Sequence, residues 1–396
     1  MTDTRLHNSA GRIVMSLNMG KIFGVKIKIH YTWLIIFFLI TWSLAVSYMP
    51  LQFPGLSDII YWIIGSISAI SLFVSVLVHE LAHSYVALKQ GIEVPSITLF
   101  LFGGVSEIAE EPKSPNDEAK MALVGPLSSF VISALFVLLW FVAVTLDLGP
   151  FIIAPFSYIA IINALLGGFN ILPAFPLDGG RVLRAVLWKW KNNLIVATKL
   201  STKISEAIAY IMIGTGFIMT FYFSLFTGLW IVFIGWFLKN GSEASLKQTL
   251  ISQALSDVKV KEIMNSQVVT ISSTTTISDA FEQYFANYTH GGFPVTKNEK
   301  IDGIITFGDL KNITKEKMQS TLVSDVMTPR EKLIWVSPDE PAVEAILKLS
   351  KNNIGRLPVL KEDKLVGIIT RSDLMKAIRP RIRGENRLPL EAFENM

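Results

Sequence analysis

Long stretches without a charged side chain alternate with short charged connections over the first part of the chain. Asp, Glu, Lys and Arg are absent from residues 29–56, 59–78, 121–146, 148–177 and 207–238. Each stretch meets or exceeds the roughly 20 residues that an α-helix needs to cross a bilayer. The last is long enough for two short spans that turn near residues 224–228. The pattern therefore predicts about six transmembrane helices.

After Lys239 the pattern changes abruptly, because charged residues are scattered through the rest of the chain and no later stretch could span a bilayer. This part contains an internal repeat, since "GIITFGDL" at residues 303–310 returns as "GIITRSDL" at residues 367–374. Each copy predicts a strand, a helix, two short strands and a second helix. Two small α/β units of this kind normally pack together.

The expected fold class is therefore a polytopic α-helical membrane domain followed by a soluble α/β pair. We place the membrane domain at residues 1–245, the two copies at residues 246–319 and 320–382, and a tail at residues 383–396.

Composition and charge support this division. The chain is 51% hydrophobic with a mean hydropathy of +0.46, which is high for a soluble protein. Lys and Arg gather before the first span and after the fourth, whereas the opposite connections hold acids such as Asp58 and Asp147. By the positive-inside rule this predicts a multi-pass protein of the cell membrane, embedded in the lipid bilayer, with both termini cytoplasmic. The same basic flanks account for the net charge of +4, so we expect no nucleic-acid partner.

Ionisable groups stand at the end of the second span, in "VHELAH". The chain has no cysteine, so any metal must be held by His, Asp or Glu. His79 and His83 are four residues apart, which puts both imidazoles on one helix face at a spacing that can clamp a single ion. Glu80 lies beside them as a candidate general base for a metal-activated water. The pattern is short, and a polar pair on a cytosolic helix remains the alternative.

A distant carboxylate reaches the same depth. The second span runs about 30 Å from Ile59 to His79 at the helical rise of 1.5 Å per residue. The fourth span runs in the same direction and ends in "NILPAFPLDGG", where Asp178 is the first acid. Asp178 can complete a His, His, Asp ligand set for zinc. Alternatively, it caps the helix that follows an interfacial turn; we favour the ligand, because ionisable groups at membrane depth are usually functional.

Three motifs together resemble one family. "HELAH", "GPLSS" at residues 125–129 and "NILPAFPLDGG" at residues 170–180 look like the site-2 protease family of intramembrane zinc metalloproteases. The repeats resemble the CBS-domain pair that a subset of that family carries. The resemblance implies one zinc per chain held by His79, His83 and Asp178, with Glu80 as the catalytic base. It also implies membrane-anchored protein substrates, cut in regulated intramembrane proteolysis.

Substrate contacts can also be predicted. Residues 96–107, "SITLFLFGGVSE", resemble the membrane-associated strand of that family, whose edge can pair with an unwound substrate. A re-entrant apolar loop without a substrate role is the alternative. Asn170 can donate a hydrogen bond to the substrate or to the developing oxyanion. A helix-packing amide is the alternative for Asn170.

The soluble copies each keep a Thr and an Asp that can bind a nucleotide ribose in CBS-like units. These pairs are Thr306 with Asp309 and Thr370 with Asp373. The predicted ligand is an adenine nucleotide, ATP or AMP, acting on protease activity. A purely structural or dimerising role, which would give a homo-oligomer through the CBS domains, remains the alternative.

Two other functions use the same residues. A nucleotide-gated membrane transporter or ion-binding protein could use the His, His, Asp cluster as a transport site. A metal-free scaffold that senses nucleotide would bind no zinc. Glu80 separates the first from a protease, because only a protease must lose all turnover in Glu80→Gln while keeping its metal.

Overall fold

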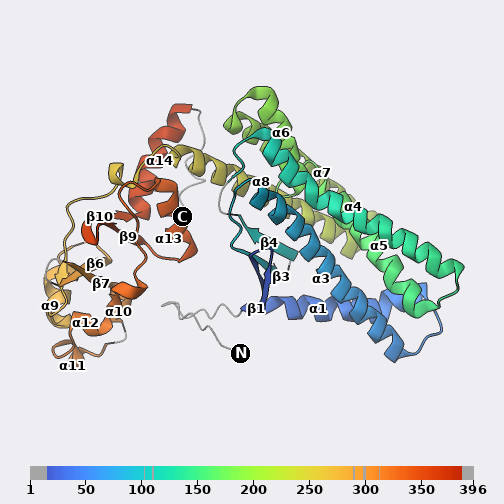
Figure 1. Cartoon of the computed structure of the whole chain (residues 1–396), viewed down its shortest axis with the longest axis horizontal. Coiled ribbons are helices and arrows are strands. Elements are labelled where there is room, and N and C mark those ends of the chain that lie inside the picture. The colour runs from blue at the N-terminus through green and yellow to red at the C-terminus, as the bar shows by residue number, and fades with distance from the viewer. Residues whose placement is uncertain are drawn as a thin grey trace. The chain divides into compact units, whose positions relative to one another are not determined.

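The computed structural model describes residues 16–101, 103–108, 111–288, 290–297, 300–311 and 313–385. Its contacts divide the chain into two units, Met1–Leu246 and Lys247–Met396, which we describe one at a time (Figure 1). Most of the predicted tail, residues 386–396, lies outside the described residues.

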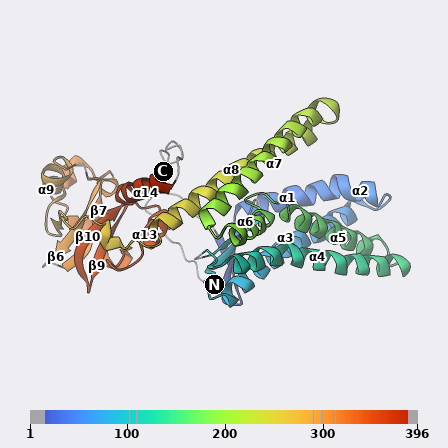
Figure 2. The same ribbon diagram turned by 90° about the horizontal axis from the view of Figure 1, so that it is seen from above.

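Apolar helices dominate the first unit. Among the described residues, five helical segments are long and apolar enough to cross a membrane: Thr32–Gln52, which joins α1 (Thr32–Ser43) through a π-helical turn (Leu44–Tyr48) to α2 (Met49–Gln52), α3 (Asp58–Lys89), α4 (Pro115–Thr145), α5 (Pro150–Asn170) and α7 (Leu194–Tyr222). This confirms the predicted membrane domain. The predicted sixth transmembrane helix is not among these five: α8 (Leu225–Leu255) is helical there, but its apolar part ends at Leu238 and is shorter than the roughly 20 residues that a span needs. α7 and α8 lie side by side (Figure 2), because Gly216 and Gly228 leave no room for a side chain between them.

Burial in this unit is typical of helices in lipid. Large apolar side chains point outward, as at Val131, Leu138 and Phe141 of α4, which are 68%, 59% and 60% exposed. Small residues fill the contacts between helices, including Ala122 and Ser129 of the same helix, which are fully buried. Helices that pack through small residues can approach closely, which is the usual arrangement where the solvent is itself apolar.

A small sheet lies at the end of α3 that carries the histidines. Its strands are β1 (Ser16–Ile22), β2 (Val25–His30), β3 (Ser96–Phe100) and β4 (Gly103–Glu107), in the order β1-β2-β3-β4. β2 pairs with β3 in parallel, and β3 pairs with β4 antiparallel from Ser96↔Glu107 to Phe100↔Gly103. The prediction of a strand at residues 96–107 is confirmed as the hairpin β3–β4. β1 and β2 precede the first span and were not predicted.

α5 ends at Asn170, and a short turn leads to α6 (Asp178–Lys191). α6 begins with Asp178 and carries basic residues in its last turn. It is too polar to span, and it packs on both α4 and α7. The turn after α5 and α6 itself therefore lead the chain from the end of the fourth apolar segment back toward α3 and α4.

The second unit contains the two copies that the repeat predicts. The first copy holds β5 (Ile271–Ser272), α9 (Ile277–Ala280) with a π-helical turn (Phe281–Phe285), β6 (Gly292–Lys297), β7 (Lys300–Thr306) and α10 (Phe307–Leu310). α11 (Lys315–Met318) lies at the end of the first copy, and α12 (Val323–Val326) lies at the start of the second. The second copy holds β8 (Thr328–Pro329), α13 (Ala342–Lys351), β9 (Arg356–Lys361), β10 (Lys364–Thr370) and α14 (Arg371–Glu385).

The two copies exchange their leading segments. β8, near the start of the second copy, pairs with β7 of the first, and Asn265, near the start of the first copy, bridges to Ile368 of the second. Gly303 and Gly367 occupy equivalent positions under these crossings, where an added Cβ would meet Met327 or Met264 within 2.8 Å. The exchange joins the copies into one pair.

Candidate metal centre

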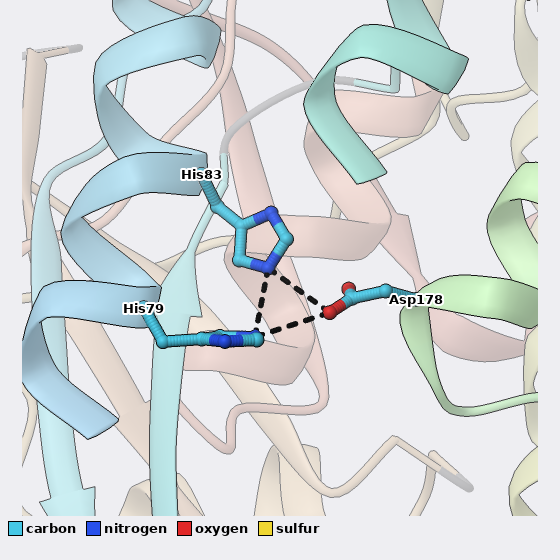
Figure 3. A group of neighbouring side chains, drawn as sticks. All are labelled: His79, His83 and Asp178. Carbon is cyan, nitrogen blue, oxygen red and sulfur yellow. Dashed lines mark hydrogen bonds and ion pairs between the residues drawn. The ribbon is translucent and has the colours of Figure 1, made fainter. Parts of the chain in front are cut away.

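The two histidines of "HELAH" meet on one face of α3. His79 and His83 are 4% and 5% exposed, so both imidazoles are removed from solvent. Their Nε2 atoms lie 3.2 Å apart (Figure 3). The four-residue spacing predicted this shared face, and the fold points it at the interior of the helix bundle.

Asp178 completes a triangle of ligand atoms. Its Oδ2 atom lies 3.1 Å from Nε2 of His79 and 3.2 Å from Nε2 of His83, across 99 and 95 positions of the chain. Asp178 is the first residue of α6, so the turn after α5 aims its carboxylate at α3 (Figure 3). Within the described residues, these three form the group whose ligand atoms lie close enough together to hold one metal ion.

The far side of each imidazole ring is also bonded. Nδ1 of His83 donates a 2.6 Å hydrogen bond to the backbone carbonyl of Met121, and Nδ1 of His79 lies 2.9 Å from Oγ of Ser129. A carbonyl only accepts, so Nδ1 of His83 carries a proton, and it is Nε2 that a neutral ring presents to the triangle as a lone pair. Such outer partners orient metal-ligating histidines and set their tautomer.

The donor set and its spacing fit zinc. Two ligand atoms on a tetrahedral zinc, with bonds of roughly 2.0–2.1 Å, are about 3.3–3.4 Å apart. The observed separations of 3.1–3.2 Å are close to that edge. Two imidazoles and one carboxylate leave a fourth position for water or substrate, as in catalytic zinc sites.

Gly125 of "GPLSS" makes room for this triangle. A Cβ atom at Gly125 would lie 2.1 Å from Nε2 of His83 and 2.7 Å from Nε2 of His79. No side chain fits there without displacing both rings. The motif's Gly therefore serves the cluster directly.

Glu80 lies beside the triangle of ligand atoms, and its carboxylate bonds to a residue outside that triangle. Its Oε2 atom accepts a 2.7 Å hydrogen bond from Oγ of Ser106, in β4. Glu80 is half-buried and is not one of the three grouped ligands. This leaves its carboxylate for acid–base chemistry next to the triangle.

Asn170 lies at the last position of α5 and is half-buried. Its Nδ2 donates a 3.0 Å hydrogen bond to the carbonyl of Leu166, one turn back in the same helix. The structure thus places Asn170 at the start of the turn that leads to Asp178, with one amide proton already in use.

A buried ion pair holds α6 against α4. Nε of Arg184 donates a 2.6 Å hydrogen bond to Oε1 of Glu118, and the two side chains are 5% and 1% exposed. Arg181 adds a second guanidinium, 4.0 Å from the same oxygen. Since α6 begins at Asp178 and α4 contains Gly125, this pair ties together the two helices that close the site.

In the second unit, the predicted nucleotide residues are helix caps. Oγ1 and the backbone N–H of Thr306 both donate to Oδ2 of Asp309, at 2.7 and 2.8 Å. Thr370 and Asp373 repeat the arrangement at 2.6 and 3.0 Å. The caps fix each carboxylate at the start of α10 or α14.

Arg356 reaches from the second copy to the first. Its Nη1 donates to the carbonyl of Gly292, and an added Cβ at Gly291 would lie 3.0 Å from its Nη2. Burial lowers the pKa of the Arg356 guanidinium. A half-buried cation thus stands between the copies, next to Thr306, which is paired with Gly292 across β6 and β7.

The sequence missed four participants in the first unit: Ser129, Met121, Gly125 as a cluster residue, and Ser106. "GPLSS" carried a signal for Ser129, because a polar residue on an apolar helix face needs a partner. A backbone carbonyl such as that of Met121 leaves no signal in a sequence.

Comparisons with known proteins bear on both units. The model of the family described as peptidase family M50 matches residues 67–148 and 144–219, which include His79, His83 and Asp178. The model described as the CBS domain matches residues 260–315 and 323–380.

Whole-chain relatives match as well. Zinc metalloprotease MJ0392 of Methanocaldococcus jannaschii is 31% identical over 364 residues, which cover 92% of this chain and 96% of that protein. Rip3 of Mycobacterium tuberculosis is 30% identical over 365 residues, which cover 92% and 93%. Among solved structures, the site-2 protease from Methanocaldococcus jannaschii is 30% identical, with a TM-score of 0.39, and covers 58% of this chain and 94% of that chain.

Proposed function

The chain belongs to peptidase family M50 and is a metalloprotease with a CBS-domain pair, and we propose that it hydrolyses peptide bonds in or near the transmembrane segments of membrane-anchored proteins. The observation that carries this proposal is the convergence of His79, His83 and Asp178 from two distant helices of the membrane unit. His79 lies toward the C-terminal end of α3, and this position supports cleavage close to one membrane face.

In this proposal His79, His83 and Asp178 hold one zinc ion, and Met121 and Ser129 keep the two imidazoles oriented. When bound there, zinc supplies Lewis acidity to the scissile carbonyl and to the attacking water. Asp178 contributes the negative charge of the ligand set, which a buried divalent cation requires.

Glu80 is the proposed general base. It accepts a proton from water as the water oxygen bonds to the carbonyl carbon, and it returns that proton to the amine nitrogen as the C–N bond breaks. One carboxylate thus serves both half-steps, and the products are a carboxylic acid and an amine, which then equilibrate to carboxylate and ammonium. The position of Glu80 beside His79 on α3 supports this role.

A substrate helix must unwind before it can be cut, because its carbonyls are bonded within the helix. We propose that β4 receives the unwound segment. β4 is last in the order β1-β2-β3-β4, and within the described residues no further strand of that sheet covers its outer edge. A strand edge offers backbone groups to an extended peptide regardless of sequence. Asn170, at the end of α5, is proposed to donate its second amide proton to substrate or oxyanion.

The proposed orientation puts the site at the cytoplasmic face, with both termini cytoplasmic. Lys21, Lys26 and Lys28 of the sheet and the basic residues of α6 share the end of the bundle that holds the site. Asp58, at the start of α3, and Asp147, after α4, mark the other end. Basic residues concentrate on the cytoplasmic side of membrane proteins.

For the CBS pair we propose binding of an adenine nucleotide, ATP or AMP, that modulates proteolysis. Asp309 and Asp373, fixed by their threonines, can accept hydrogen bonds from ribose hydroxyls through Oδ1. Arg356 offers a cation for phosphate, and the described residues provide it with no carboxylate partner. Association of two chains through the pair is the competing role.

The test of the proteolytic function begins with metal content. Detergent-purified wild type is expected to hold about one zinc per chain, and His83→Ala and Asp178→Ala to lose it. Glu80→Gln is expected to keep the zinc and to lose turnover. A wild type that remains zinc-free after incubation with excess zinc would contradict the proposal.

A further inference from the structure

Glu80 is held by a residue far from it in the chain. Oγ of Ser106 donates a 2.7 Å hydrogen bond to Oε2 of Glu80, across 26 positions. Glu80 lies on α3 and Ser106 lies in β4, one residue before the strand ends. Neither element could create this contact alone, so the docking of β4 on α3 makes it.

A second contact shows how closely the strand crosses the carboxylate. A Cβ atom at Gly104 would lie 2.6 Å from Cγ and 3.3 Å from Cδ of Glu80. Gly104 and Ser106 are two positions apart, so they face the same side of β4, whereas Val105 between them is 50% exposed. One face of the strand therefore leaves space for the Glu80 side chain and also bonds its end.

From these two contacts we infer that Ser106 is a positioning residue for the general base. Its hydroxyl holds Oε2 and leaves the lone pairs of Oε1 to accept the proton of the attacking water. A glutamate side chain samples many rotamers unless something restrains it, and a hydrogen bond to a charged oxygen is among the stronger restraints.

The inference deepens the proposed function and rests on it. In that proposal the outer edge of β4 pairs with the unwound substrate. The strand that receives the scissile segment then also orients the base, so β4 positions both the base and the substrate. Such preorganisation of a reacting group by packed neighbours is what proton transfer at a fixed distance requires.

A neighbouring serine provides a matched control. Oγ of Ser84 donates a 2.9 Å hydrogen bond to the backbone carbonyl of Glu80 and lies 3.5 Å from Oγ of Ser106. Ser84 thus touches the same two residues without bonding to the carboxylate. Its removal should perturb local packing and leave the base in place.

The first experiment needs no substrate. Thermal midpoints are measured for metal-free wild type, Ser106→Ala, Glu80→Ala and the double variant, all as full-length chains in detergent. A direct contact predicts that the double variant loses less than the sum of the two single losses. Additive losses would overturn the inference. The same cycle with Ser84→Ala is expected to be additive.

The second experiment separates positioning from mere stability. Zinc content and cleavage of fluorescein-labelled casein, an unfolded polypeptide, are measured for Ser106→Ala, Ser106→Thr and Ser84→Ala. Ser106→Ala is expected to keep its zinc and its KM while kcat falls about tenfold, a part of the roughly 10²–10⁴-fold that a general base contributes. Ser106→Thr, which keeps the hydroxyl, should recover most of kcat.

An unchanged kcat in Ser106→Ala, or a loss that follows loss of zinc, would overturn the positioning role. If zinc-loaded wild type fails to cleave casein, that result counts against the proposed function, while the unfolding cycle still decides the contact. The two hypotheses therefore fail separately.

Discussion

Nδ1 of His83 donates a 2.6 Å hydrogen bond to the backbone carbonyl of Met121, a residue 38 positions further along the chain. This single contact sets the tautomer of the ring and turns its Nε2 lone pair toward His79 and Asp178. Three groups rich in lone pairs then face one another within 3.2 Å. Such an arrangement gains stability when a cation binds between them.

Removing the metal should destabilise the membrane unit. If zinc binds only the folded chain, stripping it from a protein that held it at 1,000 times Kd costs about 4 kcal/mol. Thermal unfolding before and after chelation should show a clear fall in the midpoint for wild type. Asp178→Ala, which lacks one ligand, should respond much less. Equal responses in both proteins would place the chelated metal elsewhere.

Gly125→Ala should expel the metal. The new methyl would stand 2.1 Å from Nε2 of His83, so the rings must move, at a cost of about 1–3 kcal/mol for overpacking. Zinc per chain and the unfolding midpoint should both fall. Gly168→Ala in α5 is the control, because a Cβ there meets nothing within 4 Å. Helix propensity predicts a gain of roughly 0.5–1 kcal/mol for that control.

Ser129→Ala should weaken zinc binding and leave the fold intact. The substitution removes the partner of Nδ1 of His79, and loss of such partners typically costs about 10–100-fold in metal affinity. Competition with a chelator of known affinity measures the change. Ser128→Ala is matched to it, since Oγ of Ser128 bonds to the carbonyl of Gly125 in its own helix. If Ser128→Ala has as large an effect, Ser129 has no special role.

Arg184→Met should be strongly destabilising. It leaves the Glu118 carboxylate buried without the partner that bonds it, and breaking a buried pair from one side costs about 3–5 kcal/mol. Because α6 begins at Asp178, zinc affinity should fall as well. Glu243→Gln breaks the exposed pair with Lys239 and should cost no more than about 0.5 kcal/mol. Comparable losses of unfolding free energy in the two variants would refute the conclusion that the buried Glu118–Arg184 pair holds α6 against α4.

Asp309→Ala and Asp373→Ala should weaken adenine-nucleotide binding. Calorimetry with ATP and AMP on the full chain is the measurement, and a loss of at least about tenfold is expected, because each removes charge-assisted acceptors worth about 1.5–3 kcal/mol. Asp279→Ala is the control, because Oγ1 of Thr276 at the start of α9 also donates to the carboxylate three residues on, at 2.7 Å, outside the repeated motif. This control should keep its nucleotide affinity, because Asp279 is not part of the repeated motif. Wild type that binds neither nucleotide would leave dimerisation as the role of the pair.

Much of this protein follows from patterns within short segments. The uncharged stretches predict the membrane helices, because the bilayer requires about 20 apolar residues per span regardless of the rest of the fold. The spacing of His79 and His83 predicts a shared face, because the helix period is fixed by backbone geometry. The repeat predicts two similar soluble units, since similar segments adopt similar local structures.

The tertiary structure decided what distant segments do for one another. That Asp178 points at the two histidines depends on the turn after α5 and on the Glu118–Arg184 pair, which no local pattern encodes. β2, which precedes the first span, joins β3 through pairing across some 70 positions, as in Lys26↔Ser96.

In the sequence, Gly125, Ser129 and Ser106 look like many other small residues of apolar helices and strands. What distinguishes them is the neighbour that lies opposite each one in the folded chain. A glycine indicates that little space is available, and a serine indicates that a hydrogen-bond partner is available. Neither residue identifies the neighbour concerned. The sequence by itself determines the types of ligand and their local spacing, because helix and bilayer geometry are the same in every protein. The partners that orient those ligands are set by packing between segments, which exists only once the chain has folded.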